Sequence, residues 1–255
     1  MCGLYGSINT NKPSFSLLDG LLKHRGPDGA NEYSYKNVYL FHSRLAIQDL
    51  SKRAYQPFNF KHLSIIFNGE IYNHLELRER CKSFNFKTSS DTETLIALYL
   101  KYNFNMLNYL DGMFSIALLD RKNNSIFLAR DRAGVKPLFI YEKNNMISFA
   151  SELNTLSHIL NPSINQSSVY KYLALGVING SSIYENVREF PAGHYCEIDL
   201  NTLDYNLKQW WNVHDFYNQQ SSLSIKDTSK KVEEYLYKGV KRRLQASDLE
   251  VGCFL

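Results

Sequence analysis

The sequence predicts an α+β fold in which two stacked β-sheets are covered by helices. Apolar, β-rich runs outnumber the helical patterns, and the helical patterns fall between groups of those runs. Hydrophobic residues make up 44% and aromatic residues 14% of the 255 residues, which is enough for a substantial packed core. No internal repeat interrupts this order.

The predicted strands are short apolar runs bounded by turn residues. The first follows the start of the chain at Leu4–Ile8. The others are Val38–Leu45, Leu63–Tyr72, Met113–Leu119, Ser125–Arg130, Pro137–Tyr141 and His194–Leu200.

Helical periodicity is clearest over Asp91–Tyr102, where Leu95, Leu98 and Tyr99 share one face and Ser90 stands in the N-cap position. Shorter helices are predicted at Phe15–His24, His74–Lys82 and Ser167–Leu175. Turn chemistry separates the elements at Arg25–Gly29, Asn144–Asn145 and Asn179–Gly180.

The composition changes after Trp211, which predicts a domain of residues 1–211 and a different unit over residues 212–255. Residues 212–224 are polar and are expected to form a linker. A long helix is predicted at Ile225–Gln245 and a strand at Leu249–Leu255. A helix that leads into a strand is half of a βαβ unit, so we expect residues 212–255 to open a truncated α/β domain. The apolar face of this helix should then be partly exposed in the present chain, or packed on a neighbouring molecule.

Charge and cysteine usage narrow the class of protein. The net charge is +4, and the basic cluster Lys238–Arg243 lies within a helical pattern, so neither nucleic acid nor a membrane surface is an expected partner. The four cysteines are far apart and form no CxxC pair, which argues against a zinc site or a disulfide framework. With no signal peptide and no apolar run of membrane-spanning length, the expectation is a soluble cytoplasmic protein.

Cys2 is the first candidate for chemistry. Removal of Met1 would leave Cys2 with a thiol and a free α-amine, whose ordinary pKa values are about 8.5 and about 7.7–8.0. The amine could therefore act as the base that activates the thiol. The alternative is that Cys2 is only a small residue tolerated by the processing enzyme, since free cysteines are usually buried apolar side chains.

Three other polar positions stand beside apolar strand runs, and each has a simpler alternative. Arg44 could bind a carboxylate through paired N–H groups, or it could be a solvent-facing residue at a strand end. Asn68 and Gly69 could form an oxyanion hole, or a hairpin turn. Asp91 could hold a substrate ammonium, or it could simply favour the start of a helix. Together these residues describe a pocket for an amino acid whose side-chain amide is attacked, and glutamine fits best.

Beyond this reasoning, the chain resembles the class II (N-terminal nucleophile) glutamine amidotransferase domain of glutamine-hydrolysing asparagine synthetases. The resemblance covers essentially the whole chain, with its motifs in family order. The matching stretches are Met1–Gly3, Arg25–Gly29, His42–Ile47, Phe67–Asn73, Ser90–Glu93, Asp111–Phe114, Arg130–Gly134, Phe149–Glu152 and Pro191–His194.

The resemblance implies a four-layer αββα sandwich of two antiparallel sheets. It also implies that Cys2 is the nucleophile with its own amine as base, and that Asn68 and Gly69 form the oxyanion hole. Glutamine would form a γ-glutamyl thioester and release ammonia, and water would then release glutamate.

The same resemblance implies the substrate contacts. Arg44 would bind the glutamine carboxylate, Asp91 and backbone groups near Gly69 and Glu70 would bind its ammonium, and Leu45 and Ile47 would line the pocket. Three of the motifs, Arg25–Gly29, Asp111–Phe114 and Arg130–Gly134, are interpreted first as turn and packing elements.

In a full-length relative, the ammonia would reach a synthetase domain in which ATP activates aspartate. ATP and Mg²⁺ are therefore implied for the missing domain, and no cofactor is expected in this chain, which has no glycine-rich phosphate loop. Two alternatives remain: an amidotransferase that acts on another carboxylate such as a sugar acid, and a non-catalytic relic. A homodimer is a further expectation that the residues leave open.

Overall fold

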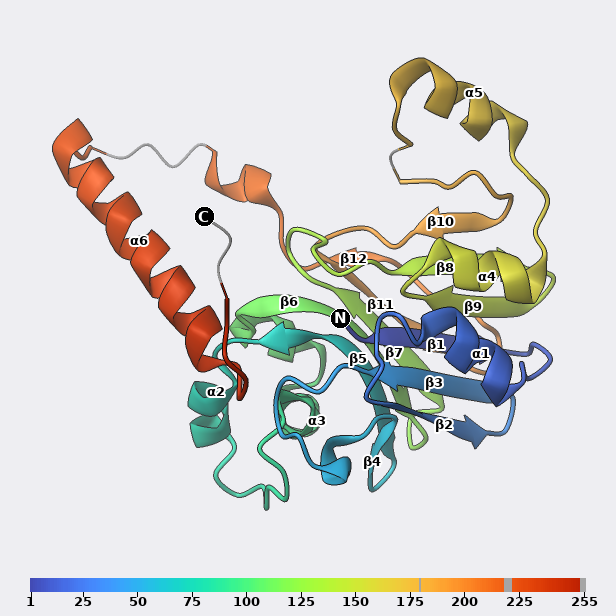
Figure 1. Ribbon diagram of the computed structural model, residues 1–255, viewed down its shortest axis with the longest axis horizontal. Helices are drawn as coiled ribbons and strands as arrows, with labels where there is room; N and C mark the ends of the chain where they lie inside the picture. The colour runs from blue at the N-terminus through green and yellow to red at the C-terminus, as the bar shows by residue number, and fades with distance from the viewer. Residues whose placement is uncertain (179, 218–221, 253–255) are drawn as a thin grey trace.

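In the computed structural model, which describes residues 1–178, 180–217 and 222–252, two antiparallel sheets face each other and helices cover their outer sides (Figure 1). The described residues form six strands in each sheet. This is the predicted four-layer αββα arrangement. The N-terminus lies in the middle of the molecule.

The first sheet has the strand order β10-β8-β9-β1-β3-β2. Its strands are β1 (Gly3–Ile8), β2 (Gly29–Tyr35), β3 (Val38–Arg44), β8 (Phe139–Lys143), β9 (Met146–Ala150) and β10 (Val187–Glu189). The second sheet has the order β12-β11-β7-β6-β5-β4. Its strands are β4 (Phe58–Phe60), β5 (Leu63–Ile71), β6 (Gly112–Asp120), β7 (Ser125–Arg130), β11 (His194–Asp199) and β12 (Lys208–Gln209).

Three apolar clusters hold the layers together. The middle cluster joins the inner faces of the two sheets through residues such as Leu4, Leu40, Ile66 and Leu128. A second cluster packs the second sheet against α2 (His74–Arg80) and α3 (Asp91–Tyr102). A third packs the first sheet against α1 (Phe15–Leu22) and α4 (Leu153–Leu160). Burial of apolar side chains between all four layers is the main source of stability.

Every strand predicted up to residue 200 is present, although the run predicted at Pro137–Tyr141 is shifted to β8, two residues later. Helix α3 has its predicted bounds, and Ser90 caps it by accepting a hydrogen bond of 3.2 Å from the backbone N–H of Thr92. Asn144 and Asn145 both have positive φ and form the turn between β8 and β9, as predicted. The predicted turn at Asn179–Gly180 includes Asn179, which lies outside the described residues.

The prediction omitted the strands β2, β4, β9, β10 and β12 and the helix α4, together with the 3₁₀ helices Lys52–Ala54, Asn103–Tyr109 and Val213–Phe216. Of the omitted strands, β4, β10 and β12 have only two or three residues, and β2 is a polar edge strand. Such segments carry little apolar periodicity of their own, because the neighbouring strand rather than the local sequence stabilises them.

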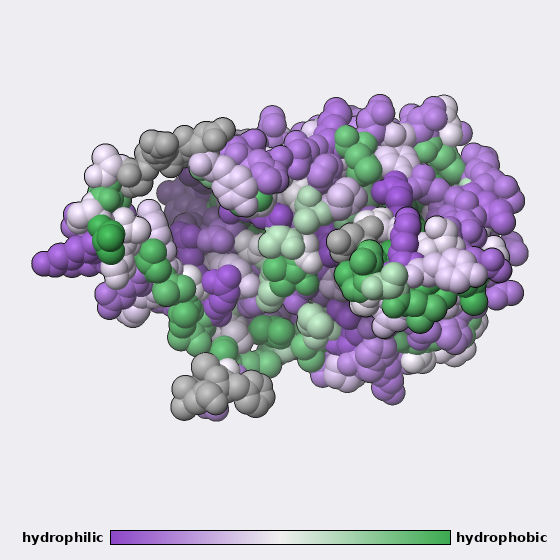
Figure 2. Space-filling model, turned by 90° about the horizontal axis from the view of Figure 1, so that it is seen from above, coloured by the Kyte–Doolittle hydropathy of each residue, from purple (hydrophilic) through white to green (hydrophobic). Residues whose placement is uncertain are grey.

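Helix α5 (Gln166–Leu175) and helix α6 (Ile225–Gln245) lie outside the sandwich (Figure 1). The predicted apolar face of α6 is exposed: the exposed fractions of Val232, Tyr235, Leu236 and Val240 lie between 51% and 67%. Figure 2 shows hydrophobic side chains gathered along α6 at one end of the molecule. The exposed face agrees with the first of the two expected outcomes, and whether a second molecule covers it stays a prediction.

The predicted strand at Leu249–Leu255 is wrong for its first four residues. Residues 249–252 have no strand partner in the described structure, and Cys253–Leu255 lie outside the described residues. Just before them, the backbone N–H of Asp248 donates to the carbonyl of Ile47, in a loop of the sandwich. An extended segment becomes a strand only where a neighbour pairs with it.

None of the helices in the described ranges is both long and apolar enough to cross a membrane. The same residues contain no group of three or more metal-ligating side chains. Cys2, Cys81 and Cys196 are free thiols.

Candidate active site

Cys2 immediately precedes β1, a fully buried strand near the middle of the first sheet. The strand packs closely because Gly6 leaves room for Phe149: a Cβ on Gly6 would lie 2.2 Å from that ring. The Cys2 sulfur accepts a hydrogen bond of 3.4 Å from the backbone N–H of Leu45. The backbone carbonyl of Cys2 accepts a hydrogen bond of 3.0 Å from Nε of Arg25. The thiol therefore has one defined position at the edge of the sandwich.

A cavity of about 190 Å³ opens beside this thiol. All eight residues predicted for the site line it: Cys2, Arg44, Leu45, Ile47, Asn68, Gly69, Glu70 and Asp91. They come from the first sheet, the second sheet, the loop after β3 and the start of α3. The fold thus brings together positions that are up to 89 residues apart, from residue 2 to residue 91.

Asn68 and Gly69 lie within β5, where they pair with Ser115 and Phe114 of β6. The hairpin-turn interpretation of this Asn-Gly pair is therefore wrong. The Asn68 side chain is fully buried, and both Nδ2 and Oδ1 lack a hydrogen-bond partner among the described residues. A buried amide without partners is costly, so the site is organised for a group that the protein itself does not supply.

The backbone N–H of Gly69 is also available. The backbone N–H of Phe114 donates to Oδ2 of Asp131, and the carbonyl of Phe114 accepts from the backbone N–H of Asp131. Both backbone groups of Phe114 therefore face the β7 side of the strand. In an antiparallel ladder, Gly69 and Phe114 must then be a non-hydrogen-bonded pair, so the N–H of Gly69 points away from β6. A Cβ at Gly69 would lie 2.2 Å from the carbonyl oxygen of Met113, which explains the glycine.

Arg44 is only 5% exposed, so it is not the solvent-facing strand end that the alternative described. Its guanidinium donates to the carbonyls of Ser51 at 2.8 Å, Gln48 at 3.2 Å and Asp49, and it lies over the ring of Tyr55. In the part of the chain that the structure describes, it forms no ion pair with a carboxylate. A buried cation without a carboxylate partner suits an anionic ligand group.

Asp91 and Glu70 provide the opposite charge. Burial and, to a smaller extent, the neighbouring Glu70 raise the pKa of Asp91 to about 7. Burial also raises the pKa of Glu70, whose Oε1 has no partner among the described residues. Oδ2 of Asp91 accepts a bond of 3.0 Å from the N–H of Ile71. Two carboxyl groups that form no ion pair with the described residues could hold a substrate ammonium.

Several lining residues were not predicted: Met1, Gln48, Ala54, Gln56, Phe67, Ser90, Thr92, Met113 and Lys136. Gln56 is held by the N–H of Phe67 at 2.6 Å and by the hydroxyl of Thr92 at 3.1 Å. Nothing in the local sequence marks Gln56, Phe67 or Thr92 as pocket residues, because only the packing of the segment around β4 against β5 and α3 places them there.

Lys136 could have been found through the motif that precedes it. Asp131 accepts bonds from the backbone N–H groups of Phe114, Ala133, Val135 and Lys136. Arg130 donates to the Lys136 carbonyl at 2.8 Å. This motif, interpreted as a packing element, therefore holds a lysine in the wall of the cavity. The side chain is 5% exposed, and burial lowers its pKa.

Whether the nitrogen of Cys2 is a free amine depends on Met1, which also lines the cavity. Burial raises the pKa of the Cys2 thiol, although the bond from Leu45 opposes this shift. Burial lowers the pKa of the Met1 amine, and nearby Lys136 and Arg25 lower it as well. While Met1 is attached, the nitrogen of Cys2 belongs to a peptide bond and cannot serve as a base. The α-amine of Cys2 becomes available as a base only after Met1 is removed.

The sequence profile of the glutamine amidotransferase domain matches residues 1–211. "Putative asparagine synthetase [glutamine-hydrolyzing] 2" of Methanocaldococcus jannaschii is 35% identical, covering all of this chain and 54% of the relative. "Asparagine synthetase [glutamine-hydrolyzing] 2" of Bacillus subtilis is 36% identical, covering all of this chain and 37% of the relative. The chain thus spans about half or less of these relatives.

Among solved structures, glutamine phosphoribosylpyrophosphate amidotransferase from B. subtilis has a TM-score of 0.63 with 19% identity. The match covers 82% of this chain and 49% of that one. At this identity, the similarity concerns the fold, and it confirms the two-sheet architecture described above.

Proposed function

This chain belongs to the glutamine amidotransferase domain family, and on that premise we propose that it hydrolyses glutamine to glutamate and ammonia through a thioester on Cys2. One observation carries the proposal most directly. A single cavity contains a thiol, a buried arginine and two carboxyl groups that form no ion pair with the described residues, and a buried amide without a partner among them. These groups complement the carboxylate, ammonium and side-chain amide of glutamine.

The first half of the reaction forms the thioester. After Met1 is removed, the Cys2 thiol gives its proton to the α-amine, and the sulfur attacks the side-chain amide carbon of glutamine. Nδ2 of Asn68 and the N–H of Gly69 donate to the oxygen that becomes negatively charged. The carbon–nitrogen bond then breaks, and the protonated amine gives its proton to the leaving ammonia.

The second half returns the enzyme to its starting state. The amine takes a proton from water, which attacks the thioester carbon, and the same oxyanion donors act again. The carbon–sulfur bond breaks, glutamate leaves, and the Cys2 sulfur recovers its proton. Arg44 would hold the substrate carboxylate, and Asp91 and Glu70 would hold its ammonium throughout, with Leu45 and Ile47 along the wall.

The fate of the ammonia belongs to a longer protein. We propose that such a protein uses it to amidate aspartate, and that ATP and Mg²⁺ are bound by residues outside this chain. The names of the M. jannaschii and B. subtilis relatives support aspartate over a sugar acid as acceptor. We further propose that residues 1–211 form the glutaminase domain and that residues 212–255 belong to the start of an ATP-dependent synthetase domain.

The lining of the cavity argues against the alternative that this domain is a non-catalytic relic, because it includes Cys2, Arg44, Asn68 and Asp91. The three described thiols support action in the reducing cytoplasm. We propose that the chain forms a homodimer, and sedimentation analysis over a range of protein concentrations tests this.

The decisive experiment measures intact mass and glutamate release on the same preparation. A protein that lacks Met1 should release glutamate, while Cys2→Ala should release none and melt at a similar temperature. A preparation that lacks Met1 but has no activity, or a Cys2→Ala variant that keeps it, would overturn the proposal.

A further inference from the structure

The loop after β3 connects the two charged ends of the pocket. Ile47 and Gln48 line the cavity, and the carbonyls of Gln48 and Asp49 accept bonds from Arg44. Oε1 of Gln48 accepts a bond of 3.2 Å from the N–H of Asp91. The position of this loop therefore affects both the cation and the carboxylate that face the substrate.

The outer side of the same loop is bound to the segment after α6. Nε2 of Gln48 donates to the Ala246 carbonyl at 2.6 Å. Oδ2 of Asp248 accepts from the N–H of Asp49 at 2.8 Å, and the N–H of Asp248 donates to the Ile47 carbonyl at 3.0 Å. The Gln48 side chain thus bridges the Ala246 carbonyl and the N–H of Asp91, and its bond to Ala246 spans 198 residues of sequence.

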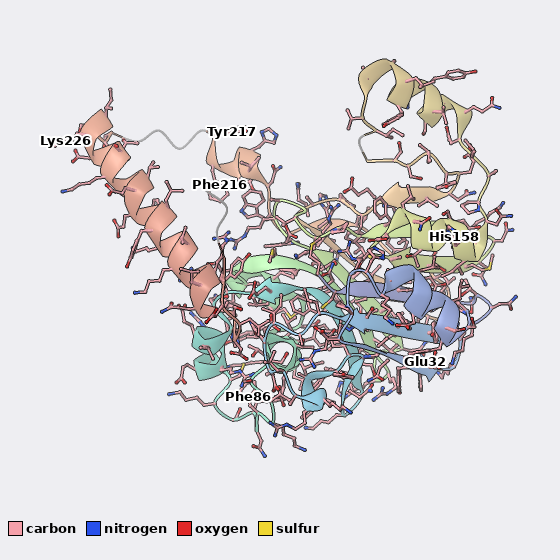
Figure 3. All side chains as sticks on the ribbon, viewed as in Figure 1. Glu32, Phe86, His158, Phe216, Tyr217 and Lys226 are labelled. Carbon is pink, nitrogen blue, oxygen red and sulfur yellow. The ribbon has the colours of Figure 1, made fainter. Side chains whose placement is uncertain are left out.

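Helix α6 itself is joined to the sandwich at the same end. Arg242 forms ion pairs with Asp111 and Glu76, and Arg243 lies 4.6 Å from the ring centre of Tyr72. The opposite end of the helix, near Lys226, is remote from the sheets (Figure 3). Movement of α6 would therefore reach the sandwich through residues 242–248.

We propose that Gln48 and Asp248 are positioning residues, which couple the segment after α6 to the glutamine-binding wall and thereby set the affinity for glutamine. This inference rests on the proposed function. The carboxylate and ammonium of glutamine keep their charges throughout hydrolysis, so groups that bind them stabilise ground state and transition state alike. A displaced loop should therefore raise KM and leave kcat nearly unchanged.

The test uses the processed chain with three substitutions at adjacent positions. Asp248→Ala removes the acceptor for the N–H of Asp49 and should raise KM about three- to tenfold, with kcat within about twofold of the parent. Asp248→Asn keeps an oxygen acceptor and should restore KM. Ser247→Ala, whose hydroxyl bonds to Leu249 rather than to the loop, is the matched control and should behave as the parent.

Amide hydrogen exchange without glutamine provides a readout that does not depend on activity. The N–H of Asp49 should exchange faster in Asp248→Ala than in Asp248→Asn or Ser247→Ala. If the parent hydrolyses glutamine and Asp248→Ala has the parent's KM, or loses kcat instead, the coupling is refuted. A parent that lacks Met1 and still fails to hydrolyse glutamine refutes the proposed function, while the exchange comparison still decides whether the contact exists.

Discussion

Truncation of Asn68 to alanine should reduce turnover severely and leave the folded state at least as stable as the parent. The two amide atoms of Asn68 are buried and have no partner among the described residues. The variant no longer buries these two unsatisfied polar atoms, which should raise its free energy of unfolding by about 1–3 kcal/mol. The lost volume only enlarges an existing cavity, at a cost on the order of 1 kcal/mol. The net change in the free energy of unfolding is therefore near zero or favourable.

Catalysis should change in the opposite direction. Loss of one oxyanion donor lowers kcat about a hundredfold to a thousandfold, or ~3–4 kcal/mol in the barrier. KM should change little, because the oxygen gains its charge only in the transition state. The assay is glutamate release by the processed chain, in parallel with unfolding by urea.

Gln56→Ala is the control for stability. The side chain of Gln56 lines the same cavity, but both of its polar atoms are bonded, at 2.6 Å and 3.1 Å. Its truncation leaves the buried N–H of Phe67 without a partner, so it should destabilise the fold by about 1–3 kcal/mol. If Asn68→Ala is as destabilising as Gln56→Ala and keeps most of its kcat, the oxyanion assignment fails.

Three further predictions concern charge and packing. Because burial raises the pKa of Asp91 to about 7, the folded chain keeps a proton that the unfolded chain releases near pH 3.8. The free energy of unfolding should therefore fall as the pH rises from about 4 to 7. Urea unfolding of Asp91→Asn should show a flatter dependence of this free energy on pH. Lys136→Met removes a cation from the cavity, which should raise the pKa of the Cys2 thiol and lower kcat/KM at neutral pH by about tenfold. In a pH–rate profile of this variant, kcat/KM should recover at higher pH, whereas Lys136→Arg should retain the parent's profile. Gly6→Ala places a Cβ 2.2 Å from the ring of Phe149 and should destabilise the fold by about 1–3 kcal/mol. Gly20→Ala lies within α1, where the new Cβ meets no atom within 4 Å, and should stabilise the fold by about 0.5–1 kcal/mol. Equal unfolding midpoints for these two variants would contradict the packing argument.

Local sequence signals predicted the elements that carry their own periodicity. Helix α3 could be placed to the residue because an apolar face, an N-cap serine and acidic residues in the first turn all agree. The strands β5, β6 and β7 each contain an apolar run, at Ile65–Phe67, Ile116–Leu119 and Ile126–Ala129. The short edge strands β4 and β12 could not be placed, because their pairing depends on neighbours rather than on a pattern of their own.

The chemical types of the site residues can be identified without coordinates: a thiol after Met1, an arginine at a strand end, an asparagine before a glycine, and a carboxylate at a helix start. That these groups face one cavity follows from the packing of the two sheets and α3. Tertiary packing also determines that Asn68 and Gly69 lie in a strand rather than a turn, that Lys136 and Gln48 belong to the cavity wall, and that residues 246–248 bind the loop after β3. The physical reason is that covalent order and periodicity act over a few residues, whereas cavities and unpaired buried groups arise where layers that are distant in sequence pack together.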